Sequence, residues 1–173
     1  MIILVTGPVH AGKTTRVRTL VERMAATGVP LAGYLSRAVR EGSGIVGYDL
    51  EVVGTGETQP FLRRTEAGKS GRRDLEAGSF RFVPAGLNRA REIVRGSRAG
   101  GLLVVDEVGP AELEGRGIWP PLEAQLRDPE RKLLLVVRDS LLETVLERLP
   151  GRPAVVRFDA EDAGERLLEE MGR

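Results

Sequence analysis

The chain has 173 residues, of which 41% are hydrophobic, and its 26 basic and 25 acidic residues leave a formal net charge of +1. This length is typical of one compact domain, so we expect a single domain over residues 1–173. The lack of cysteine and the presence of only one histidine exclude thiol chemistry and a structural zinc site. The balanced charge also argues against nucleic acid as a partner.

The lack of long apolar segments indicates where the protein resides. No run reaches the length of a membrane span, and the apolar run at residues 2–5 is too short for a signal peptide. We therefore expect a cytoplasmic protein without a membrane partner, either a monomer or a weak homo-oligomer. Asparagine occurs once and cysteine not at all, which favours a thermophilic source, although codon bias in a GC-rich genome has the same effect.

The first predicted elements surround a glycine-rich loop. Ile2–Val5 is a continuous apolar run, typical of a strand covered on both faces, and Thr14–Thr27 has a helical pattern that ends before Gly28 and Pro30. Between them, Gly7–Thr14 matches G-x-x-x-x-G-K-[ST], in which glycines let the backbone aim N–H groups at phosphate oxygens. A strand before and a helix after are the context in which this loop works. The sequence therefore predicts a binding site for a nucleoside triphosphate.

This loop supplies several candidate site residues. Lys13 is expected to neutralise charge on the β- and γ-phosphates, and the Thr14 hydroxyl to bind Mg²⁺. His10 stands at a variable position where the backbone faces the phosphates, so we do not favour a catalytic role for it. Pro8 has no N–H to donate. The expected nucleotide-binding residues are Gly7, Pro8, Val9, His10, Ala11, Gly12, Lys13, Thr14 and Thr15.

The segment from residue 31 to residue 82 is rich in glycine. Within it Val46–Val52 alternates polar and apolar residues, which predicts a β-hairpin insertion. The following stretch, Arg63–Arg73, is polar and aperiodic, so we expect an exposed, mobile loop, with a lid over phosphates as the less favoured interpretation. This loop lacks the interleaved aromatic residues of a platform for single-stranded nucleic acid.

The second half of the chain continues an alternation of strands and helices. Continuous apolar runs at Leu102–Val105, Leu133–Val137 and Ala154–Phe158 predict buried parallel strands. The patterns that predict helices are Pro84–Val94, Pro121–Arg127, Leu141–Leu149 and Asp159–Met171. This alternation predicts an α/β fold of three layers, a P-loop NTPase with a mainly parallel central sheet and the β-hairpin insertion.

Two adjacent carboxylates follow the strand that begins at Leu102. Asp106 is expected to emerge beside the phosphate loop, at the carboxyl edge of the sheet, and to bind Mg²⁺. Glu107 stands next to it, where a carboxylate can polarise a water for attack on the γ-phosphate. A kinase does not need such a group, so Glu107 favours hydrolysis. The alternative is that both residues only cap the next turn.

Phosphoryl transfer also needs positive charge from outside the loop. Arg138 follows a predicted strand and is expected at the same sheet edge as the carboxylates, where it either senses phosphate or forms an ordinary surface ion pair. Arg40, in the glycine-rich segment, has the same two interpretations. We expect Arg16 and Arg18 to be solvated, and Trp119 to pack in the core rather than to stack on a base.

Three motifs together identify a family. The first is the phosphate loop Gly7–Thr15, and the second is Asp106–Leu113, which reads D-E-V-G-P-A-E-L. The third combines Gly33-Tyr34 with Val39-Arg40 and Gly47–Leu50. The set resembles the THEP-type nucleoside-triphosphatases, which include the cancer-related nucleoside-triphosphatase and carry the specific signature D-E-I-G-x-M-E-L. The three motifs span most of the chain.

The resemblance implies Mg²⁺-dependent hydrolysis of ATP, GTP and other triphosphates to diphosphate and phosphate, with loose base selectivity and slow turnover. Three positions depart from the family pattern: Ser36 replaces Thr, Ala38 replaces an acidic residue and Ala111 replaces Met. The change at Ala38 is expected to alter substrate contacts. The residues expected to act in catalysis are Lys13, Glu107, Arg138 and Arg40, with Thr14 and Asp106 as Mg²⁺ ligands.

Two other functions fit the same phosphate loop. A small P-loop kinase of a nucleotide or metabolite would close the arginine-rich loop over an acceptor and transfer the γ-phosphate to it. A non-catalytic, nucleotide-dependent adaptor would bind nucleotide tightly and show no turnover without its partner protein.

Overall fold

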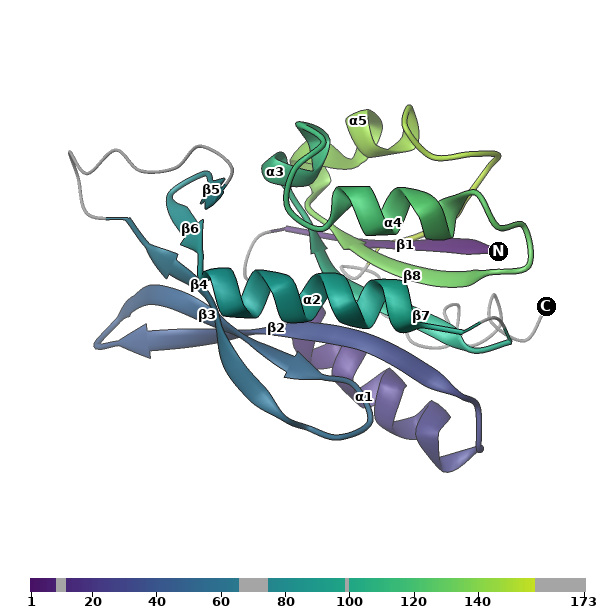
Figure 1. Ribbon diagram of the computed structural model, residues 1–173, viewed down its shortest axis with the longest axis horizontal. Helices are drawn as coiled ribbons and strands as arrows, with labels where there is room; N and C mark the ends of the chain where they lie inside the picture. The colour runs from purple at the N-terminus through teal and green to yellow at the C-terminus, as the bar shows by residue number, and fades with distance from the viewer. Residues whose placement is uncertain (9–11, 66–74, 99, 158–173) are drawn as a thin grey trace.

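The computed structural model describes residues 1–8, 12–65, 75–98 and 100–157 (Figure 1). Its centre is a sheet with the strand order β5-β6-β4-β3-β2-β7-β8-β1-β9. The parallel strands are β1 (Ile2–Thr6), β2 (Leu31–Glu41), β7 (Leu102–Val108), β8 (Lys132–Val137) and β9 (Ala154–Arg157). An antiparallel extension continues from β2 and consists of β3 (Gly44–Val52), β4 (Thr58–Arg64), β5 (Glu76–Ala77) and β6 (Phe80–Phe82).

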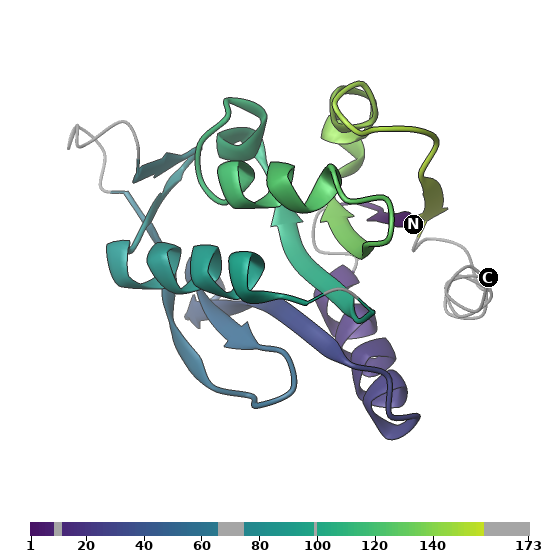
Figure 2. The same cartoon turned by 45° about the vertical axis from the view of Figure 1, so that its right-hand side comes forward.

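Helices cover both faces of the parallel strands (Figures 1 and 2). One face carries α1 (Lys13–Ala26). The other face carries α2 (Pro84–Gly96), α4 (Trp119–Leu126) and α5 (Leu142–Leu146), with the short α3 (Pro110–Leu113) and a 3-10 turn at Asp139–Leu141 near the carboxyl ends of the strands. The predicted three-layer α/β fold with a mainly parallel centre is confirmed.

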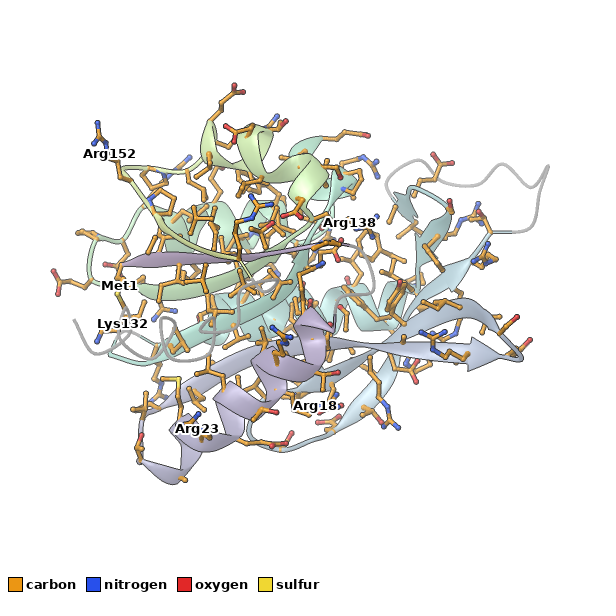
Figure 3. The ribbon with its side chains drawn as sticks, turned by 180° about the vertical axis from the view of Figure 1, so that it is seen from behind. Met1, Arg18, Arg23, Lys132, Arg138 and Arg152 are labelled. Carbon is orange, nitrogen blue, oxygen red and sulfur yellow. The ribbon has the colours of Figure 1, made fainter. Side chains whose placement is uncertain are left out.

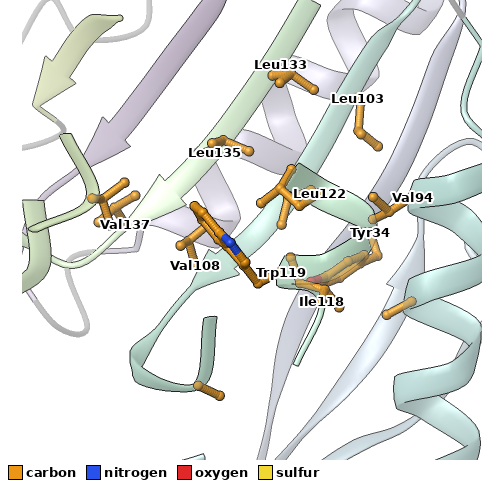
Figure 4. Packing of buried hydrophobic residues seen from close by; sticks show 14 of the residues in the cluster. Tyr34, Val94, Leu103, Val108, Ile118, Trp119, Leu122, Leu133, Leu135 and Val137 are labelled. Atoms are coloured by element: carbon orange, nitrogen blue, oxygen red, sulfur yellow. The ribbon is translucent and has the colours of Figure 1, made fainter. Parts of the chain in front are cut away.

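The strands contribute to two separate cores because successive side chains of a strand point to opposite faces. Val104 and Leu134 pack on the α1 side, together with Val17 of that helix. Leu103 and Leu135 pack on the other side, together with residues of α2, α4 and α5 (Figure 4). Burial on both faces explains why these strands are continuous apolar runs in the sequence.

The predicted elements are recovered with shifted ends. α4 begins at Trp119 instead of Pro121, because two prolines fit the first turn of a helix, where their missing N–H groups cost nothing. The helical pattern at Leu141–Leu149 becomes a 3-10 turn and the short α5. The predicted helix Asp159–Met171 and residue Phe158 lie outside the described residues.

The segment 31–82 holds more strand structure than predicted. Its first strand, β2, was missed, although it joins the parallel sheet beside β7. The expected hairpin is present: the alternating segment Val46–Val52 lies in β3, and β3 pairs antiparallel with β2. The strands β4, β5 and β6 extend this hairpin. Arg63 and Arg64 belong to β4, so their assignment to a mobile loop was wrong; the sheet pairs them with Arg81 and Phe80 of β6. The centre of that predicted loop, residues 66–73, lies outside the described residues.

Within the part of the chain that is described, no helix combines the length and hydropathy needed to cross a membrane.

Candidate active site

The phosphate loop connects β1 to α1 at the carboxyl edge of the sheet. Gly12 precedes α1 with φ of 76°, a left-handed conformation that favours glycine, and no side chain caps the helix there. The backbone N–H groups of the first turn of α1 are therefore oriented toward the loop, as in other anion sites at helix N-termini. Of the predicted nucleotide-binding residues, Gly7 is buried, Pro8 and Thr15 are exposed, and Val9, His10 and Ala11 lie outside the described residues.

Lys13 lies under the loop, and only 7% of it is exposed. Its Nζ donates hydrogen bonds of 2.7 Å to the carbonyl oxygens of Gly7 and Pro8. Burial lowers the pKa of Lys13, while the nearby carboxylates of Glu107, Asp139 and Asp106 act in the opposite direction. The ammonium group is therefore held at the loop and surrounded by negative charge before any phosphate binds.

Asp106 is the last residue of β7 before the register of its pairing with β8 shifts. It is 2% exposed and accepts a 3.1 Å hydrogen bond from the backbone N–H of Ser36. The Ser36 hydroxyl donates to the Asp106 carbonyl, and the Thr14 side chain is hydrogen-bonded to the carboxylate. Burial nevertheless raises the Asp106 pKa to about 6, so these hydrogen bonds and the charge of Lys13 do not fully compensate the buried carboxylate.

Glu107 occupies a β-bulge, since Asp106 pairs with Val136 and Val108 pairs with Val137, the very next residue of β8. Such bulges redirect a side chain and are frequent beside active sites. Glu107 forms an ion pair of 2.5 Å with Nε of Arg138, which follows β8, and both side chains are partly exposed. The structure therefore brings Arg138 to the edge where the sequence predicted it, already paired with the second carboxylate.

One cavity of about 240 Å³ joins the two halves of the predicted site. Asp106, Glu107 and Arg138 line it together with the exposed Arg40. Its other lining residues are Gly12, Lys13, Thr14, Thr15, Arg18, Ser36, Arg37, Ala38, Ile45 and Tyr48. Arg18 was predicted to be solvated, and this holds only in part: its side chain is 32% exposed, and its guanidinium forms a 2.7 Å ion pair with Glu51 of β3. The neighbouring strand β3 provides this partner, which helix periodicity alone does not reveal.

A larger cavity, of about 660 Å³, lies elsewhere, around Met1, Trp119 and Arg152. Figure 3 shows Met1 and Arg152 at one side of the molecule, away from Arg138. None of the predicted site residues lines it, so volume alone is a poor guide to the site here. Trp119 is buried and packs with Ile118 and Leu122, as predicted, and Arg148 lies 5.6 Å from its ring centre (Figure 4).

Sequence reasoning assigned no role to Glu112, which is 4% exposed. Its two oxygens accept hydrogen bonds of 3.1 Å from the backbone N–H groups of Gly109 and Ile118. These bonds tie the start of α3 to the start of α4, directly after Glu107. Burial raises the Glu112 pKa to about 7, despite both hydrogen bonds. The sequence offered one indication that Glu112 has a role, which is that it belongs to the motif Asp106–Leu113.

Ser36 was noticed only as a departure from the family pattern, yet it holds Asp106 from the next strand. This contact depends on the pairing of β2 with β7, which the sequence did not predict. Asp139 was also missed. It accepts a 2.7 Å hydrogen bond from the Thr6 hydroxyl at the end of β1, close to the phosphate loop.

Comparison with known proteins gives a consistent result. The model of the NTPase family matches residues 2–169. The nucleoside-triphosphatase THEP1 of Methanopyrus kandleri is 30% identical, over 98% of this chain and 94% of its own. The cancer-related nucleoside-triphosphatase homolog of Bos taurus is 29% identical, over 64% of this chain. The matched part spans only 61% of that bovine protein.

Two solved structures have a similar fold. The solution structure of a human cancer-related nucleoside triphosphatase has a TM-score of 0.73 and 22% identity, covering 98% of this chain and 95% of that one. The crystal structure of THEP1 from the hyperthermophile Aquifex aeolicus has a TM-score of 0.70 and 22% identity, with both chains fully covered. The phosphate loop, the two carboxylates and the antiparallel extension thus lie on a fold that is already known.

Proposed function

The chain belongs to the NTPase family, and from this premise we propose that it is a Mg²⁺-dependent nucleoside-triphosphatase. It hydrolyses ATP, GTP and other nucleoside triphosphates to the diphosphate and phosphate. The observation that carries this proposal is the single cavity that joins Lys13 and Thr14 to Asp106, Glu107 and Arg138. A phosphate loop alone serves many reactions, whereas a partly exposed carboxylate in the same cavity supports attack by water.

The residues around Asp106 fit a magnesium ion. Mg²⁺ prefers oxygen ligands, keeps several waters and needs only one or two protein groups beside the phosphates. The Asp106 carboxylate is buried, and the Thr14 hydroxyl is hydrogen-bonded to it. Its hydrogen bonds and the charge of Lys13 offset only part of the cost of burying its negative charge. Asp106 and Thr14 would therefore hold the ion, directly or through water. When bound, the ion supplies positive charge to the β- and γ-phosphate oxygens.

The remaining steps belong to the side chains. Lys13 exchanges its loop carbonyls for phosphate oxygens and stabilises the charge that develops on them. Arg138 moves from Glu107 toward the γ-phosphate, and this frees the carboxylate to orient a water. Arg40 adds positive charge at the outer end of the cavity. The protein thus exchanges one internal ion pair and the hydrogen bonds of Lys13 for contacts with the substrate.

The test of this function is Glu107→Gln, which keeps the size of the side chain and removes its charge. We expect phosphate release from MgATP and MgGTP to fall by about 10² to 10⁴-fold, the usual contribution of a positioned base. Binding of a fluorescent nucleotide should survive, because Lys13 and the loop remain. Phosphate release is measured in steady state across several triphosphates, with Mg²⁺ and with excess chelator.

Glu114→Gln is the matched control, since Glu114 is exposed and paired with Arg116 outside the cavity. It should hydrolyse ATP at the rate of the unmodified protein. Full activity of Glu107→Gln would refute the role of Glu107, and turnover that does not depend on Mg²⁺ would refute the metal requirement. Labelled γ-phosphate on an organic acceptor would instead favour a kinase.

A further inference from the structure

The antiparallel extension brings most aromatic side chains of the protein to the active site. Phe61 contacts Tyr34 with ring centres 5.4 Å apart and Phe82 with ring centres 5.3 Å apart. Tyr48 and Phe80 form a third pair, with ring centres 5.3 Å apart. Rings in such arrangements stabilise one another beyond their simple burial, so they form a stiff wall.

The wall encloses a second, smaller cavity directly behind Glu107. The rings that line it are Tyr48, Phe61, Phe80 and Phe82, and its polar residues include Glu107, Arg138, Ser36 and Glu112. Four residues belong to both cavities, namely Ser36, Tyr48, Glu107 and Arg138. The small cavity therefore adjoins the nucleotide cavity at the Glu107 carboxylate. Its volume of about 60 Å³ corresponds to roughly two water molecules in the liquid.

We propose that this aromatic wall restricts the phosphoryl acceptor to water. The inference rests on the hydrolytic function proposed above and adds its acceptor specificity. A molecule that reaches Glu107 from this side has room for a hydroxyl group, but its carbon chain meets the rings of Tyr48 and Phe80. Tyr48, Phe80 and Phe82 are thus specificity-determining residues and not catalytic ones.

The reaction is the same for water and for an alcohol. The hydroxyl oxygen forms a bond to the γ-phosphorus as the bond from that phosphorus to the β–γ bridging oxygen breaks, and the electron pair stays on the departing nucleoside diphosphate. The hydroxyl proton passes to the Glu107 carboxylate and then to solvent. Water yields inorganic phosphate and an alcohol yields its phosphate monoester. The ratio of the two products therefore measures the acceptor selectivity directly.

Phe80→Ala is the decisive variant, because this ring is only partly buried and its loss opens the wall with little damage to the core. The unmodified protein and the variant are given MgATP in buffer containing ethanol or glycerol, and phosphorus NMR quantifies the products. We expect the ratio of monoester to phosphate to rise about tenfold or more in the variant, since a pocket discriminates one methylene by 10 to 200-fold. The unmodified protein should yield almost only phosphate.

Ile93→Ala on α2 is the matched control: Ile93 is also partly buried but does not line either cavity. Its product ratio should equal that of the unmodified protein. ADP release is measured in the same samples and reports total turnover. If ADP forms and the Phe80→Ala ratio does not change, the inference is overturned; if the unmodified protein forms no ADP, the hydrolytic function itself has failed. If Phe80→Ala does not fold, Tyr48→Leu opens the wall instead. An unchanged ratio of monoester to phosphate in Tyr48→Leu would also overturn the inference.

Discussion

Asp106 illustrates the conflict between stability and function at the level of one residue. The carboxylate is buried, and its pKa rises from 3.8 to about 6 although it is hydrogen-bonded by Ser36 and Thr14. A raised pKa means that the folded protein binds the proton more tightly than the unfolded chain does. The stability that this group contributes in its protonated form is therefore lost as the pH rises from 3.8 through about 6. In the proposed function, the charged form of Asp106 binds the Mg²⁺ ion that accompanies the nucleotide.

We predict that Asp106→Asn stabilises the metal-free protein and abolishes hydrolysis. The amide still accepts from Ser36 but carries no buried charge, so the free energy of unfolding should rise by about 2 to 3 kcal/mol above the folded-state pKa. The gain should shrink as the pH falls below about 6 and vanish below 3.8, where Asp106 is protonated in both states. Urea unfolding with a chelator, followed across this range, measures the gain. A less stable variant, or a gain that does not change with pH, would contradict this interpretation.

The loop that follows β7 is the element that determines where Glu107 lies. Glu112 bridges Gly109 and Ile118, and thus ties both ends of this loop to one buried carboxylate. Close packing supports the bridge: a Cβ added to Gly117, whose φ is +56°, would lie 1.9 Å from Oε1 of Glu112. The D-E-V-G-P-A-E-L motif therefore contains both the pair of carboxylates to which we assign roles in hydrolysis and the buried carboxylate that holds the loop after them.

For this element we predict a stability that declines with pH. The Glu112 pKa is raised from 4.5 to about 7, so the contribution of its protonated form is lost as the pH rises through this interval. The loss is about 3 kcal/mol, from a shift of this size. Glu112→Gln should lack this loss, although it is less stable at low pH because its amide nitrogen cannot accept a hydrogen bond. The measurement is the free energy of unfolding of both proteins against pH, and parallel curves would exclude Glu112 as the titrating group.

Strand β2 depends on Gly33 for its place in the sheet. A Cβ at this position would lie 2.0 Å from the carbonyl oxygen of Val104 in β7, and the φ of Gly33 is +129°. Gly33→Ala should therefore destabilise the protein by more than about 3 kcal/mol, from overpacking and backbone strain together.

Gly28→Ala is the matched control, because its φ of +79° brings strain but a Cβ there meets open space. It should cost only about 1 to 2 kcal/mol. Equal losses in thermal or urea unfolding would refute the role of close strand approach.

The same element shows why sequence reasoning succeeded in one half of the site and failed in the other. Lys13 and Asp106 follow continuous apolar runs, so their strands and their common edge were predictable. β2 mixes small, polar and apolar residues without a regular period, and no local pattern predicts that an antiparallel strand pairs with one of its edges and a parallel strand with the other. The contacts of Ser36, Arg18 and the aromatic wall all depend on that pairing. They are properties of tertiary structure and not of periodicity.

At the scale of the whole molecule, the site exists only in the folded sheet. The phosphate loop follows β1 and the carboxylates end β7, and β8 separates these two strands. A nucleotide that uses both halves binds the folded protein and not the unfolded chain, so it must raise the stability of the whole sheet. The Mg²⁺ dependence of this effect reports whether the two halves act together, because Asp106 and Thr14 come from different segments.

We therefore predict that a non-hydrolysable ATP analogue raises Tm only when Mg²⁺ is present. At about 100 times its Kd the ligand contributes about 2.7 kcal/mol, which corresponds to a rise of roughly 5 to 10 °C for a domain of this size. Mg²⁺ or chelator without nucleotide should leave Tm nearly unchanged, since the described residues contain no cluster of acidic or histidine side chains that would hold a structural metal. Lys13→Ala should lose most of the rise, because the ammonium group is the main cation of the loop. A full rise in that variant, or one that needs no Mg²⁺, would mean that the nucleotide binds at a different place on the molecule.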